Sequence, residues 1–113
     1  MPDIKAVVIP ADLLKPFEVI EMGADDGERI SEIVGGYYQC IDVPNASIWM
    51  NEDGKHLGMP TNERATQYLY DERPEFINRD VIVGDVLVLG GYDDEGNSLG
   101  IPDDVAERLL AAS

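Results

Sequence analysis

The apolar segments of this chain are short, and most of them end at a glycine or a proline. Ile4 to Ile9 is rich in β-branched residues and stops at Pro10, and Val86 to Leu89 stops at two successive glycines. Segments of this length are typical of strands in a sheet and are far too short to cross a bilayer. The pattern therefore predicts a small domain built around a sheet, without a membrane segment.

Three further segments have strand character, and a turn signal follows one of them. The segments are Phe17 to Met22, Tyr37 to Val43 and Ser47 to Met50. The residues that follow, Asn51 to Lys55, contain an Asp-Gly pair that favours a tight hairpin turn. We therefore expect His56 to Met59 to form the returning strand of that hairpin.

Three segments have the spacing and the end signals of helices. Glu28 to Val34 places apolar residues on one face and ends at paired glycines. Thr61 or Asn62 can cap a helix that runs to about Asp71, and Pro102 suits the first position of a last helix. Together these elements predict a single α+β domain over residues 1–113, with a mostly antiparallel sheet and about three helices.

The chain is strongly acidic. It has 23 acidic and 8 basic residues, which give a formal net charge of −15. Hydrophobic residues make up 44%, so the charge belongs to a folded domain and not to a disordered tail. Such a charge repels nucleic acid and anionic membranes, so we expect neither to be a direct partner and expect a basic host protein instead.

Several features bear on the compartment in which the chain works. Cys40 is the single cysteine, so an internal disulfide is excluded. The chain begins Met-Pro-Asp, with no basic segment followed by a long apolar stretch, so we expect no secretory signal. These observations predict a cytoplasmic protein.

The residues that carry metal or catalytic chemistry do not form a complete motif. A calcium loop needs a glutamate six residues after its glycine, and the three acidic glycine turns have Ile33, Pro60 and Pro102 there. Cys40 and His56 are the only thiol and the only imidazole, and nothing local activates the thiol. We therefore expect no metal, no cofactor and no catalytic residue, and predict that the chain is not an enzyme.

The start of the second predicted helix is the best candidate for a ligand site. Backbone amides at a helix start stabilise anions, and Thr61, Asn62 and Arg64 provide donors beside them. These three residues are the predicted binding site for a small phosphorylated ligand or nucleotide. In the alternative interpretation, Thr61 or Asn62 merely caps the helix and Arg64 pairs with an acidic neighbour.

Acidic runs are the candidate surface for a protein partner. The predicted protein-binding residues are Asp25, Asp26, Glu28, Glu32, Asp93, Asp94 and Glu95. If folding gathers them, their carboxylates could imitate DNA phosphates and block a basic site; if not, the charge serves only solubility in high salt. Exposed tyrosines and a sheet edge would also allow a homodimer.

Part of the chain resembles a small-domain family of unknown function. The matching segments are Ile33 to Tyr37, Asn51 to Lys55, Gly58 to Asn62 and Asp80 to Gly90. The family pattern runs V-G-G, then N-E-x-G-K-x-x-G-x-P-x-N, then D-x-I-x-G-x-x-x-x-x-G, and the resemblance spans Glu28 to Gly91. The family occurs in bacteria, archaea, plasmids and phages, often actinobacterial phages. This resemblance implies a mobile-element context and the α+β fold, and it carries no activity.

Overall fold

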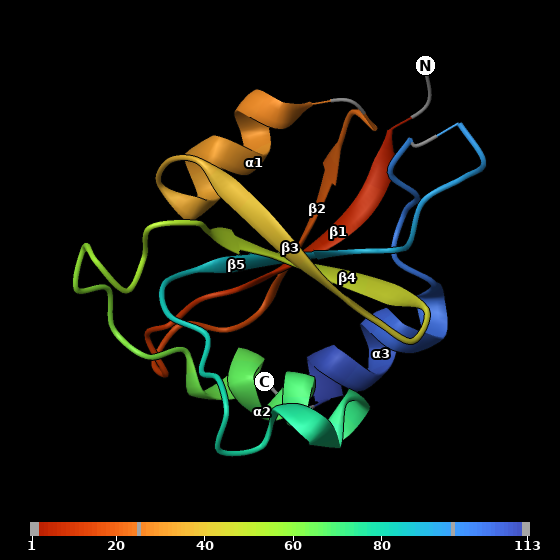
Figure 1. Cartoon of the computed structure of the whole chain (residues 1–113). Coiled ribbons are helices and arrows are strands. Elements are labelled where there is room, and N and C mark those ends of the chain that lie inside the picture. The colour runs from red at the N-terminus through yellow and green to blue at the C-terminus, as the bar shows by residue number, and fades with distance from the viewer. Residues whose placement is uncertain (1–2, 25, 96, 112–113) are drawn as a thin grey trace.

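The computed structural model describes residues 3–24, 26–95 and 97–111 (Figure 1). Five strands and three α-helices form the domain, together with one short 3-10 helix at Pro74–Phe76. In chain order the elements are β1 (Ile4–Ile9), β2 (Glu18–Met22), α1 (Gly27–Val34), β3 (Tyr38–Val43), β4 (Ala46–Asn51), α2 (Glu63–Glu72), β5 (Val86–Leu89) and α3 (Asp103–Ala111).

The five strands form one antiparallel sheet in the order β2-β1-β5-β4-β3. β5 comes last in sequence but lies at the centre, between β1 and β4. All four of its residues are buried, as expected for an apolar strand covered on both faces. The edge strands are β2 and β3. This sheet with its three α-helices confirms the predicted α+β class.

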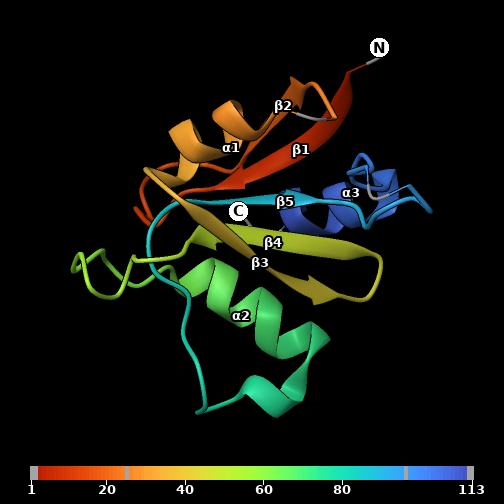
Figure 2. The same ribbon diagram turned by 45° about the horizontal axis from the view of Figure 1, so that its top comes forward.

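The sheet separates two cores, and Figure 2 shows α1 on one side of it and α2 on the other. Period-two alternation along the strands sends side chains to the two faces in turn. Under α1 the buried residues are Ala6, Met22, Ile30, Leu87 and Leu89. The larger core, under α2 and α3, includes Val7, Ile9, Ile48, Leu69, Val86, Val88, Val105 and Leu109.

The predicted strand His56 to Met59 is wrong. Both sides of β4 are already occupied, because β3 pairs along its whole length and β5 pairs with Ser47 to Trp49. Residues 52–58 instead form successive turns, in which Leu57 N donates to the carbonyl of Asp53 at 2.9 Å. The backbone amides there find partners within the loop, and the hairpin is made by β3 and β4 across Pro44-Asn45.

The helices lie close to their predicted positions, with one difference on α3. Helical spacing predicts an apolar face made by Val105, Leu109 and Leu110. Val105 and Leu109 are buried, but Leu110 is 38% exposed and Ala106 takes its place on the buried face. The turn of the helix decides this, since 105, 106 and 109 lie on one side of it. No helix among the described residues has the length and apolar character needed to cross a membrane.

Candidate functional site

Asn62, the centre of the predicted ligand site, is turned into the protein. Its side chain is fully buried and caps α2, with Oδ1 accepting from the backbone amide of Ala65 at 3.0 Å. Its Nδ2 donates to the carbonyls of Ile9 at 2.8 Å and Gly84 at 2.9 Å. Both donor hydrogens and the acceptor are therefore used inside the fold, which is the geometry of the capping alternative.

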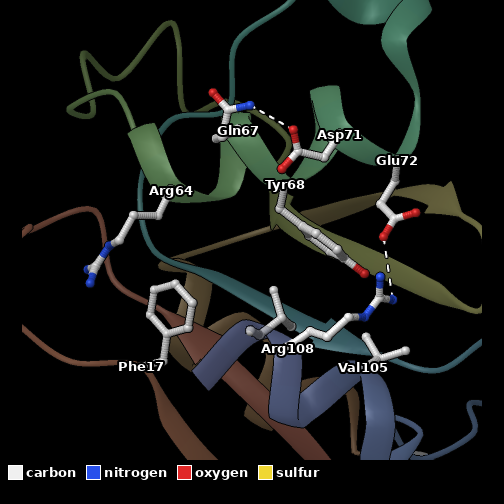
Figure 3. A pocket seen from close by; sticks show the side chains of 9 residues that line it. Phe17, Arg64, Gln67, Tyr68, Asp71, Glu72, Val105 and Arg108 are labelled. Atoms are coloured by element: carbon white, nitrogen blue, oxygen red, sulfur yellow. Dashed lines mark hydrogen bonds and ion pairs between the residues drawn. The ribbon is translucent and has the colours of Figure 1, made fainter. Parts of the chain in front are cut away.

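The two other predicted ligand residues do not converge with Asn62. Arg64 donates through one nitrogen to the carbonyls of Pro10 at 2.8 Å and Asp12 at 2.9 Å, instead of pairing with an acid. Its guanidinium also lies 4.7 Å from the centre of the Phe17 ring. Figure 3 shows these two side chains beside each other. Thr61 is exposed and makes a backbone bridge to Val83. Their contacts hold α2 against neighbouring loops.

The residues that carry the family resemblance also have structural roles. Asn51 is 5% exposed and donates to the carbonyl of Val34 at 3.1 Å, so it caps the end of α1. A Cβ at Gly54 would lie 2.8 Å from a methyl of Val83, so only glycine fits without a shift. Lys55 forms an ion pair with Asp80. These contacts fix the loop after β4 against the turn before β5.

The predicted protein-binding acids fall into two groups, and each has one member with a structural role. Asp26 caps α1 by accepting from the amide of Arg29 at 3.1 Å. Asp93 accepts from the amides of Glu95 and Asn97, both at 2.9 Å, which shapes the turn after β5. The remaining described members, Glu28, Glu32, Asp94 and Glu95, are exposed. Asp25 lies outside the described residues.

A row of three aromatic rings connects the two acidic groups. Trp49 makes edge-to-face contacts with Tyr38 on one side, at 5.3 Å between centroids, and with Tyr92 on the other, at 6.2 Å. Tyr38 reaches the start of α1, where a Cβ at Gly27 would lie 2.8 Å from its hydroxyl. Tyr92 begins the turn that carries Asp93 to Glu95. The row therefore runs from the start of α1 to the start of the turn that carries the second acidic group.

Hydrogen bonds hold this row in place. The indole nitrogen of Trp49 donates to the hydroxyl of Ser47 at 2.9 Å. The hydroxyl of Tyr92 lies 2.9 Å from the Cys40 thiol. Burial, the bond to Cys40 and then the charges of Cys40 and Asp42 raise the pKa of Tyr92 above its ordinary value. Tyr92 therefore stays neutral near pH 7.

An open hollow beside this row combines carboxylates with exposed tyrosines. It is lined by Glu28 and Glu32 of α1, by Glu52, and by Tyr37 and Tyr38. Tyr37 is 79% exposed, which is unusual for a large aromatic residue without a partner surface. We call the combined surface the acidic-aromatic face. Its members are Glu28, Glu32, Tyr37, Tyr38, Trp49, Glu52, Tyr92, Asp94 and Glu95.

Another acidic group lies on the opposite side of the sheet and is paired there. Glu72 of α2 forms an ion pair with Arg108 of α3 at 3.6 Å, and Glu75 pairs with Arg73 at 3.1 Å. The backbone amide of Glu75 and then the hydrogen bond from Arg73 lower the pKa of the Glu75 carboxyl. These acids cannot join the acidic-aromatic face in a single continuous surface.

The remaining chemically reactive side chains are not brought together. Cys40 lies with Trp49 on the α1 side of the sheet. His56 lies in the loop after β4, beside Gln39 and Met50, whose side chains point to the other face. Among the described residues no three His, Cys, Asp or Glu side chains are grouped to hold a metal ion.

Sequence reasoning missed Glu52 and Tyr92 as parts of this surface. Glu52 was expected only in a hairpin turn, and exposed tyrosines were expected only to allow a homodimer. The signal was the pairing of β3 with β4, which sets Tyr38 and Trp49 on the same face of the sheet. That pairing could not be known until the competing strand at His56 to Met59 was excluded.

Comparison with known proteins gives a family and no further relatives. No curated protein and no solved structure matches the chain. Residues 4–112 match a family described as a domain of unknown function, which spans every strand and helix above. The chain therefore belongs to the DUF3846 family.

Proposed function

We propose that this chain is a non-enzymatic accessory protein of a phage or other mobile element, which works inside the host cell by binding a protein. The acidic-aromatic face is the binding surface, and its occupant is a basic, extended segment of a host or phage protein. One observation carries the proposal: three glutamates and two exposed tyrosines line the same hollow. A surface that served only solubility would need the carboxylates but would have no need of exposed tyrosine rings beside them.

Carboxylates and tyrosine rings attract the same partner groups. Lysine and arginine pair with Glu28, Glu32 and Glu52, and their cations also bind over the faces of aromatic rings. Arg29 lies 4.0 Å from Glu32, but this exposed pair is long and weak, so it leaves most of the negative potential in place. A basic segment therefore finds both charge and ring contacts in one place.

Mimicry of DNA is the form of this proposal in which the partner's segment normally binds nucleic acid. The second acidic group, at Asp94 and Glu95, lies beyond the aromatic row and extends the negative surface. Acids on both sides of the row support a partner longer than a single side chain. In this form the protein should compete with DNA for its partner, and the competition should weaken as salt rises.

Charge reversal on matched helices tests the proposal. The probe is an unstructured peptide rich in arginine and lysine, and its affinity is measured by calorimetry at low and high salt. Glu28→Lys with Glu32→Lys changes the acidic-aromatic face. Glu63→Lys with Glu107→Lys is the control. It changes the net charge of the chain by the same amount, but at residues of α2 and α3. The two pairs are matched in position as well, because Glu28 and Glu63 both lie in first helical turns.

We expect the first pair to weaken binding by at least about tenfold and the control pair by less than about threefold. Tyr37→Ala should weaken binding without lowering stability, because its side chain is largely exposed. Equal losses from both pairs would show that only total charge matters. That result would favour the solubility function and overturn the proposed surface.

A further inference from the structure

A second pocket lies on the other side of the sheet, between α2 and α3. It has a volume of about 300 Å³, within the size range of small-molecule sites. Phe17, Val105 and Leu109 give it an apolar wall, while α2 contributes polar side chains that include Tyr68 (Figure 3). It is separate from the acidic-aromatic face, so its occupant does not depend on the function proposed above.

Two buried polar atoms at this pocket have no hydrogen-bond partner. They are Nε of Arg64 and the hydroxyl oxygen of Tyr68. In the described part of the chain, these are the two buried side-chain nitrogen or oxygen atoms without a hydrogen-bond partner. Leaving a buried donor unpaired is unfavourable, so such groups are rare without a cause. Both residues line the same pocket. Figure 3 shows that the two groups point away from each other, so each lacks a partner of its own.

The hydroxyl of Tyr68 is poised as a donor. Figure 3 shows it pointing toward the ion pair of Glu72 and Arg108, which is long at 3.6 Å. Burial and then the charge of Glu72 raise the pKa of Tyr68 to about 12, so its proton is retained near pH 7. The nitrogen of Arg64 is also a donor, since a guanidinium has no acceptor. A partner for either group must therefore supply an acceptor atom.

The charges around the pocket decide which acceptor fits. Arg64 and Arg108 balance Asp71 and Glu72, so the lining has no formal charge. The net charge of −15 on the whole chain disfavours an anion. We propose that this pocket binds a small uncharged molecule with an aromatic ring and a carbonyl oxygen. The ring lies against Phe17, Val105 and Leu109, and the oxygen accepts from Tyr68 when the side chains of Arg108 and Glu72 adjust.

Benzamide is the probe, and amide chemical shifts of the labelled full chain report its binding. We expect saturable shifts at residues around Tyr68 and Val105, with millimolar affinity for so small a ligand. Tyr68→Phe should weaken binding at least about fivefold without reducing stability, because the lost hydroxyl has no partner. Tyr70→Phe is the control: its hydroxyl donates to the carbonyl of Asp80 at 2.6 Å, so this variant should bind as wild type does.

Four results would overturn the proposal. One is the absence of saturable shifts at the pocket, and another is unchanged affinity in Tyr68→Phe. The third is a crystal structure grown with benzamide in which an ordered water alone accepts from the hydroxyl of Tyr68. Tighter binding of benzoate or benzylammonium than of benzamide would also contradict an uncharged ligand. None of these outcomes bears on the acidic-aromatic face.

Discussion

The side-chain amide of Asn62 donates to the carbonyl of Ile9 at 2.8 Å, which ties the start of α2 to the end of β1. The same nitrogen reaches Gly84, just before β5, and the side-chain oxygen caps α2. One residue thus joins a helix, an inner strand and the turn into the central strand. These contacts explain why the family pattern has an asparagine at this position, without a ligand.

Replacing Asn62 should destabilise the protein strongly. Asn62→Ala removes a helix cap and the side-chain donor to two buried carbonyls, so we expect a loss of about 3 kcal/mol in the free energy of unfolding. Urea denaturation measures this loss. Thr61→Ala is the control and should cost under about 0.5 kcal/mol, since its side chain is exposed. A loss below about 1 kcal/mol for Asn62→Ala would contradict this structural role.

The sheet and helices could be predicted because their signals are local. β1 and β5 have the predicted bounds, since β-branched runs closed by proline or glycine leave little choice. The predicted strand at His56 to Met59 does not form, although residues 52–58 do make turns. β4 could not pair with it, because β3 and β5 already occupy both sides of β4. Strand order depends on which segments compete for β4, and that competition is decided by distant residues.

Gly90 should be irreplaceable, unlike its neighbour. A Cβ at Gly90 would overlap the carbonyl oxygen of Gly100, whose backbone runs past β5, while a Cβ at Gly91 would meet nothing within 4 Å. We expect Gly90→Ala to cost at least about 2 kcal/mol, as overpacking does, and Gly91→Ala to be neutral within about 1 kcal/mol. Thermal unfolding of the two variants side by side checks this. Equal midpoints would show that the two backbones do not approach closely.

Ionisation of Tyr68 should lower stability at high pH. Burial raises the pKa of Tyr68 from 10.0 to about 12 in the folded state, so the folded chain holds this proton more tightly. The resulting stabilisation is complete below pH 10 and is lost as pH rises from about 10 through about 12. The free energy of unfolding should therefore fall less steeply between pH 10 and pH 12 in Tyr68→Phe than in wild type. Identical slopes would mean that the hydroxyl is not buried.

The candidate surface was only partly predictable. The sequence alone predicts that Glu28 and Glu32 share a helix face, because they are four residues apart. That Glu52 and Tyr37 lie beside them depends on the position of β4 against β3, which no local pattern encodes. Likewise, Asn62 and Arg64 carry the donors expected of an anion site, but the packing of β1 and Phe17 turns those donors inward.

Amide chemical-shift mapping of an unstructured arginine- and lysine-rich peptide on the labelled protein tests the central proposal most directly. The acidic-aromatic face predicts shifts in α1, around Tyr37 and Tyr38, and in the turn at Asp94 and Glu95, all reduced at high salt. Residues of α2 and α3 should stay unchanged. Shifts centred on α2 and α3, or spread evenly over every acidic segment, would contradict the proposed binding surface.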